Sequence, residues 1–79
     1  ADRFGKGFPA DLVKRTRAML SALDAAVVLE DIRFPPSNHL EELKGARAGQ
    51  HSVRINDQWR ICFVWTDHGP ADVEIVDYH

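Results

Sequence analysis

The residues best suited to chemistry are cations in the second half of the chain and proton-carrying side chains at residues 77–79. The cations are Lys44, Arg54 and Arg60, and the last three residues read Asp-Tyr-His. Arginine binds phosphate through a planar fork and keeps its charge, whereas histidine exchanges protons near neutral pH. These residue types suit the cleavage of RNA without a metal ion.

Such cleavage needs few protein groups. The 2′-hydroxyl of one nucleotide attacks the neighbouring phosphate after a base has taken its proton, and an acid protonates the departing 5′-oxygen. Fixed cations stabilise the charge that develops on the phosphoryl oxygens. The residue types alone leave open which group is the acid and which is the base.

Metal and cofactor chemistry have little support in the sequence. The four histidines lack metal-ligand spacing, and the single cysteine, Cys62, excludes both a paired-cysteine zinc site and an internal disulfide. Cys62 lies in an apolar run, so we expect a buried thiol and a reducing compartment. No glycine-rich phosphate loop or serine nucleophile motif occurs. We therefore expect a protein without a metal or cofactor.

The length and net charge of the chain limit the kinds of protein that it can be. A chain of 79 residues predicts one domain, spanning residues 1–79. Ten basic and twelve acidic residues give a net charge of −2, which argues against binding nucleic acid through bulk charge. Any RNA contact must therefore come from a local cluster. No apolar run is long enough to span a membrane, so we expect a cytoplasmic protein.

The first half of the chain is expected to be helical. Apolar residues recur at three- and four-residue spacing from residue 9 to about residue 27, which predicts an amphipathic helix. A second, short helix is expected over residues 29–32. The proline-rich stretch at 34–38 is expected to stop all helix. Residues 39–43 are too short and mixed to assign, and the glycines at 45 and 49 indicate a loop.

From residue 51 onward the apolar period becomes two, which is typical of strands. Strands are expected around residues 51–55, over residues 59–65 and around residues 73–76, with turns at 56–57 and 67–70. Short connections between successive strands favour an antiparallel meander. The N-terminal helix then covers one face, and the fold class is α+β.

Alternation assigns the two faces of this sheet. The face under the helix is expected to carry Val53, Ile55, Ile61, Phe63 and Trp65. Trp59 is expected on the core side, with a ring for base stacking as the alternative. The opposite face carries Arg54, Arg60, Cys62 and Val64. Two arginines there indicate a phosphate-binding surface, although an ordinary solvent-facing strand is the alternative.

The end of the last strand raises a conflict. Strict alternation from Val73 puts Asp77 and His79 on the helix face and leaves only Tyr78 beside the arginines. Burying a charged, unpaired carboxylate is costly. Either the strand ends or bulges near Val76, or the catalytic group is less compact than the last three residues suggest. We favour a strand that ends near Val76.

Three stretches of the sequence carry a family resemblance. Residues 40–45, 49–63 and 73–79 include Leu-Lys-Gly, Ser-Val-Arg-Ile-Asn, Trp-Arg-Ile and Asp-Tyr-His in that order. They closely resemble the HigB group of toxins, in the RelE-like superfamily of bacterial toxin–antitoxin systems. The resemblance extends from about residue 12 to residue 79 and is most specific from residue 43 onward.

The resemblance implies a function and a site. Relatives of this type cleave messenger RNA in the A site of translating ribosomes without a metal, and their partner is a small helix-turn-helix antitoxin (HigA-like). The matching motifs point to five catalytic residues, with the histidine the most important. These are Lys44, Arg60, Asp77, Tyr78 and His79. Arg54 joins Lys44 and Arg60 as an RNA-binding residue because of the face that it occupies.

The sequence departs from this family pattern in three places. Relatives open with a β-strand ahead of the first helix, and only residues 3–8 stand in its place here. Some relatives have a histidine three residues before the lysine, where this chain has Glu41. Superfamily members are commonly basic. An alternative function is therefore a toxin-fold interaction module that binds its antitoxin and tunes transcription of the operon without cleaving RNA.

Overall fold

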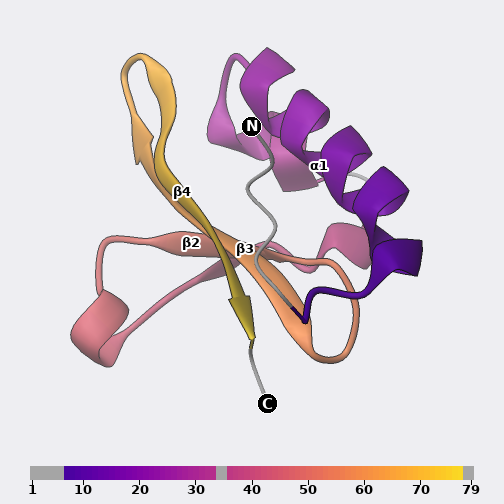
Figure 1. Ribbon diagram of the computed structural model, residues 1–79. Helices are drawn as coiled ribbons and strands as arrows, with labels where there is room; N and C mark the ends of the chain where they lie inside the picture. Colours follow the sequence, from indigo (N-terminus) through magenta and orange to yellow (C-terminus); the bar gives the residue numbers. More distant parts are fainter. Residues whose placement is uncertain (1–6, 34–35, 78–79) are drawn as a thin grey trace.

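The protein folds as a helical layer on one side of an antiparallel sheet (Figure 1). The computed structural model describes residues 7–33 and 36–77. The sheet has four strands in the order β1-β2-β3-β4, namely β1 (Glu41–Glu42), β2 (His51–Arg54), β3 (Trp59–Thr66) and β4 (Gly69–Asp77). The α+β class and the meander of β2, β3 and β4 are confirmed. The two-residue strand β1, which the sequence left unassigned, extends the meander at one edge.

The predicted amphipathic helix is present, as is the short helix after it. A 3-10 turn, η1 (Ala10–Leu12), leads into α1 (Val13–Ala25), and the chain turns extended at Ala26, where ψ is 132°. The second helix, η2 (Leu29–Arg33), is also of the 3-10 type. The Asp31 carboxylate accepts hydrogen bonds from the backbone N–H groups of Val27 and Val28, at 2.9 and 3.2 Å. No described helix is long and apolar enough to cross a membrane.

The expectation that the proline-rich stretch stops all helix was wrong. Pro36 begins a single 3-10 turn, η3 (Pro36–Asn38), while residues 34 and 35 lie outside the described residues. Proline suits the first position of a helix because the N–H that it lacks has no helical partner there. The Asn38 side chain donates a hydrogen bond to the Ile32 carbonyl at 3.1 Å, which ties this turn to η2.

The last described residue of β4, Asp77, lies one residue beyond the strand end predicted near Val76. Strand β4 continues through Asp77, which pairs with Trp59. Asp77 is exposed and accepts a hydrogen bond from the Gln58 side chain at 3.2 Å, so the cost of burying a carboxylate does not arise. A bulge does occur earlier in β4, between the partners of Cys62 and Val64. Asp72, with φ of 50°, lies in the bulge.

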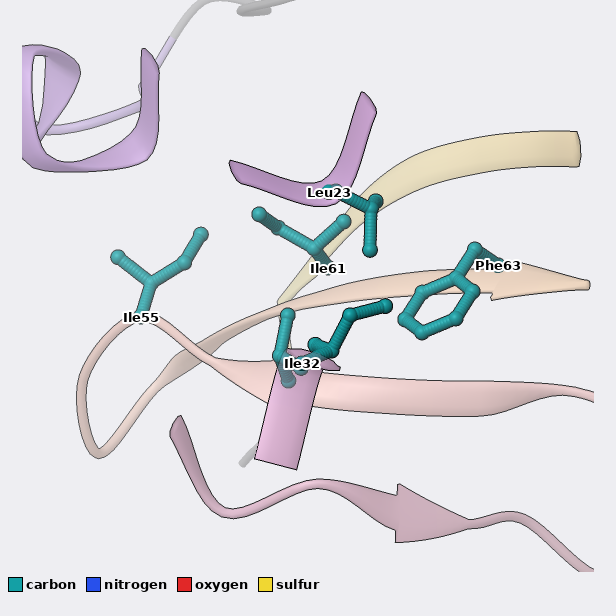
Figure 2. Packing of buried hydrophobic residues seen from close by; sticks show 6 residues of the cluster. Leu23, Ile32, Ile55, Ile61 and Phe63 are labelled. Atoms are coloured by element: carbon teal, nitrogen blue, oxygen red, sulfur yellow. The ribbon is translucent and has the colours of Figure 1, made fainter. Parts of the chain in front are cut away.

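The core lies between the helices and the sheet, as the alternation predicted. Figure 2 shows Leu23 of α1, Ile32 of η2, and Ile55, Ile61 and Phe63 packed together; each is at most 7% exposed. Val53 completes this buried cluster. Other residues assigned to the core are partly buried against it: Leu12, Met19, Leu20, Trp59, Trp65, Val73 and Ile75. Trp59 packs edge-on against Phe8, with ring centroids 5.0 Å apart, which supports its core assignment.

Candidate active site

The candidate site lies on the sheet face opposite α1, which we call the arginine face. Arg54 of β2 and Arg60 of β3 are direct cross-strand partners, and Val76 of β4 pairs with Arg60 on the other side. Paired residues project to the same side of a sheet. Because Val53 and Ile61 of the adjacent pair face the core, both arginines face away from it. The structure therefore brings Arg54 and Arg60 together as predicted.

Among the described residues, Ser52 of β2 and Glu41 of β1 hold Arg60. Its Nη1 donates to the Ser52 hydroxyl oxygen at 3.0 Å, and its Nη2 donates to Glu41 Oε1 at 3.3 Å. The Arg60 side chain is only 15% exposed and Ser52 is fully buried. Arg60 is thus not a freely moving surface cation. Its guanidinium has a defined orientation across β2.

Arg54 is more exposed than Arg60 and is held less firmly. Its guanidinium pairs with the carboxylate of Asp57, in the turn between β2 and β3. The Arg54 side chain is 34% exposed and that of Asp57 is 93% exposed. Ion pairs of such exposure contribute little to stability and exchange readily with water. Arg54 is therefore able to leave Asp57 for another anion.

A loop covers part of the arginine face. This loop contains the 3-10 turn η4 (Gly45–Arg47) and joins β1 to β2. Arg47 Nη1 donates to Gln50 Oε1 at 3.0 Å and to Glu74 Oε1, on β4, at 2.8 Å. Because β3 lies between β2 and β4, the Arg47 side chain bridges this face over β3.

The covered part of the face includes Cys62. Cys62 and Leu43 are 1% and 7% exposed, yet neither belongs to the core cluster under the helix. Cys62 pairs with Ser52 and Glu74, the residues that hold Arg60 and Arg47. The arginine face therefore has a small packed layer of its own. The buried thiol predicted for Cys62 is confirmed, and it lies in this layer, on the side away from the helix.

Burial of Cys62 predicts an unreactive thiol. Desolvation raises the pKa of Cys62 above its ordinary value of 9.0, against the opposing effect of Arg47. We expect iodoacetamide at pH 8 to alkylate the folded protein at least about 100-fold more slowly than the urea-unfolded protein, because the thiolate is the nucleophile. Since the folded pKa is raised, stability is also lost as pH rises above the pKa of the unfolded thiol.

The control is Arg47→Ala, which removes the bridge over β3. Alkylation of Cys62 should accelerate in this variant at a temperature where the fold is intact, because uncovering the thiol outweighs the loss of the Arg47 charge that lowers its pKa. Equal rates in the folded wild type and in the unfolded chain would contradict the covered face.

The structure does not bring all the predicted site residues close to Arg60. Lys44 directly precedes η4 and is exposed, and its side chain forms no hydrogen bond or ion pair with any described residue. Asp77 lies at the end of β4 beside Trp59, and its register puts it on the side opposite Arg60. Tyr78 and His79 lie outside the described residues.

Sequence reasoning missed Ser52, Arg47 and Glu74. Ser52 had a usable signal, because the same alternation that faces Arg54 away from the core does so for Ser52. Arg47 had no such sequence signal. Its contact with Glu74 joins residues 27 positions apart and depends on the path of the loop that carries Arg47. Glu41 was noticed only as a departure from the family pattern, and its contact with Arg60 depends on the unassigned strand β1.

A cavity of about 300 Å³ lies on the other side of the sheet, between α1, η2, η3 and β2. Its wall includes Met19, Leu23, Val53 and the carboxylate of Asp31, which already caps the backbone at Val27 and Val28. Within residues 7–33 and 36–77, no group of three or more His, Cys, Asp or Glu side chains is placed to hold a metal. The oriented guanidinium of Arg60 makes the arginine face the candidate site.

A small antiparallel sheet with helices on one face and oriented arginines on the other defines an α+β protein suited to an anionic ligand. The whole chain, residues 1–79, matches the family of HigB-like toxins, described as RelE-like toxins of the type II toxin–antitoxin system HigB. The chain belongs to this family. Membership implies a protein antitoxin as its partner.

Individual relatives agree with this assignment. Toxin HigB-1 of Vibrio cholerae is 36% identical over 66 residues, which cover 84% of this chain and 70% of that protein. Endoribonuclease HigB of Proteus vulgaris is 32% identical over 73 residues, 92% of this chain and 78% of the relative. An uncharacterized protein of Haemophilus influenzae is 32% identical over 60 residues, 76% of this chain but only 59% of the relative.

Proposed function

We propose that this toxin is an endoribonuclease that cleaves messenger RNA on translating ribosomes without a metal ion. The observation that carries the proposal is the pair of arginines on one face of the sheet, with Arg60 oriented by the buried Ser52 hydroxyl. The name of the Proteus vulgaris relative, an endoribonuclease, supports the same activity.

The chemistry follows from the side chains. Arg60 binds the equatorial oxygens of the scissile phosphate and stabilises the charge that grows there, because a fixed donor needs no reorganisation during the reaction. Arg54 and Lys44 bind adjacent phosphates. His79 carries a proton to or from the reacting oxygens, and Tyr78 shares the transfer. We assign Asp77 to orienting these groups, because its register separates it from Arg60.

Dependence on the ribosome has a physical reason. The net charge is −2, and Arg47, Arg54 and Arg60 each have a carboxylate partner, so attraction to free RNA is weak. A ribosome holds the mRNA in a fixed geometry and supplies the positioning that this small protein lacks. The toxin would then act in the cytoplasm, and a helix-turn-helix antitoxin of the HigA type would be its inhibitor.

The ends of the cleaved RNA test this proposal. Attack by the 2′-hydroxyl leaves a 2′,3′-cyclic phosphate and a 5′-hydroxyl, whereas hydrolysis by a metal-activated water commonly leaves a 5′-phosphate. We expect the purified toxin to cut mRNA on programmed ribosomes with a cyclic phosphate at the new end. The same mRNA without ribosomes should remain intact over the same period. Cleavage that leaves 5′-phosphates, or that is equally fast without ribosomes, would contradict the proposal.

A further inference from the structure

We infer that Glu41 occupies the anion-binding position of Arg60 and that an RNA phosphate replaces it when substrate binds. The inference rests on the proposed function and adds a residue that sets RNA affinity. Sequence reasoning gave Glu41 no role.

The first observation is where the carboxylate lies. Glu41 is the cross-strand partner of Ser52, so β1 brings it to the arginine face. Arg60 extends from β3 over Ser52 on β2, and its Nη2 meets Glu41 Oε1 at 3.3 Å. Carboxylate and phosphate oxygens suit the same guanidinium fork. The place that Glu41 fills on Arg60 is therefore one that a phosphate oxygen fits.

The second observation is that Ser52 and Glu41, the described partners of Arg60, differ in burial. Ser52 is fully buried, while the side chain of Glu41 is 53% exposed. The Ser52 contact is thus shielded from water, but the Glu41 contact opens to solvent. An exposed ion pair is weak and easily exchanged, whereas a hydrogen bond to a buried hydroxyl is costly to lose. An incoming phosphate would displace Glu41 and leave Ser52 in place.

The third observation is that the other arginines of this face follow the same arrangement. Arg47 pairs with Glu74 and Arg54 with Asp57, so each guanidinium has an internal anion in the RNA-free protein. Internal carboxylates keep neighbouring cations from repelling one another and hold them in place. They also compete with RNA phosphates. Glu41 both holds Arg60 in place and competes with phosphate for it, and Arg60 is the most buried of the three cations.

Glu42 provides a matched control for the experiment. Glu41→Gln and Glu42→Gln remove the same charge one residue apart on β1. Glu42 pairs with His51, which stacks on Phe63 of the helix-side core, so it faces away from Arg60. Any change that comes from net charge alone will appear in both variants. A change that comes from the Arg60 contact will appear only in Glu41→Gln.

The probe is a ribosome programmed with mRNA whose A-site codon carries 2′-O-methyl groups, which bind but cannot be cleaved. We expect Glu41→Gln to bind this complex about two- to fivefold more tightly than the wild type, the range given by a surface ion pair. Glu42→Gln should stay within about twofold of the wild type. In an Arg60→Ala background the gain from Glu41→Gln should disappear.

Equal affinities for the two glutamine variants, or weaker binding by Glu41→Gln, would overturn the inference. Loss of cleavage by Glu41→Gln at unchanged affinity would also overturn it, because Glu41 would then be a proton acceptor. Failure of the proposed function looks different: Arg60→Ala would itself bind and cleave like the wild type. If Arg60→Ala is defective but Glu41→Gln gains nothing, only the inference about Glu41 fails.

Discussion

Replacing Arg60 by alanine is expected to lower the single-turnover rate of mRNA cleavage by about 10²–10³-fold, the usual effect of losing one positioned transition-state donor. The variant should also lose stability, because the buried Ser52 hydroxyl loses its donor. A polar group left without a partner costs about 1–3 kcal/mol. Arg60→Lys should recover little activity, since a point charge does not reproduce the fork that contacts two strands.

Thermal melts separate the two effects of Arg60→Ala. Cleavage should be measured well below the melting temperature of the variant, where a purely structural role predicts a wild-type rate. The matched control is Arg33→Ala on η2, which removes one positive charge from an exposed pair with Glu30. Its cleavage rate should stay within about twofold of the wild type. A rate that falls only in step with stability would instead favour the interaction-module alternative.

Replacing His79 by alanine is expected to lower the cleavage rate by about 10²–10⁴-fold, the range for loss of a general acid or base. The prediction comes from the Asp-Tyr-His motif at residues 77–79, and its test is the pH dependence of single-turnover cleavage. The wild type should show an inflection near neutral pH, where histidine exchanges protons. That inflection should be absent in His79→Ala.

The control for this prediction is His68→Ala. His68 is exposed in the turn between β3 and β4, and its backbone N–H bonds to the Thr66 hydroxyl, so the side chain is dispensable for the turn. This variant should cleave like the wild type and keep its pH profile. If His79→Ala also keeps the profile and the rate, the proton carrier is another residue.

The parts of the fold that the sequence predicted are those governed by local periodicity. Two-residue alternation put Ile61 and Phe63 in the core and Arg60 on the other face, and all three assignments are confirmed. Apolar residues at three- and four-residue spacing located the helix, because residues at this spacing lie on the same side of adjacent helical turns. Strict alternation also put Asp77 on the side opposite Arg60, and the pairing of Asp77 with Trp59 agrees with it.

The environment of the site could not be predicted from the same patterns. Glu41 meets Arg60 across 19 residues and Arg47 meets Glu74 across 27. Such contacts depend on the register of a two-residue strand and on the path of one loop, for which a single sequence holds no periodic signal. The sequence identified the arginines, but the carboxylates that hold them became visible only in three dimensions.

We propose that the arginine face cleaves mRNA through Arg60. The most direct measurement is single-turnover cleavage on ribosomes programmed with end-labelled mRNA, comparing the wild type with Arg60→Ala below the melting temperature of both. We expect rapid cutting by the wild type with a 2′,3′-cyclic phosphate at the new end, and a rate about 10²–10³-fold lower for the variant. Equal rates for the two proteins, or no cleavage by the wild type, would contradict it.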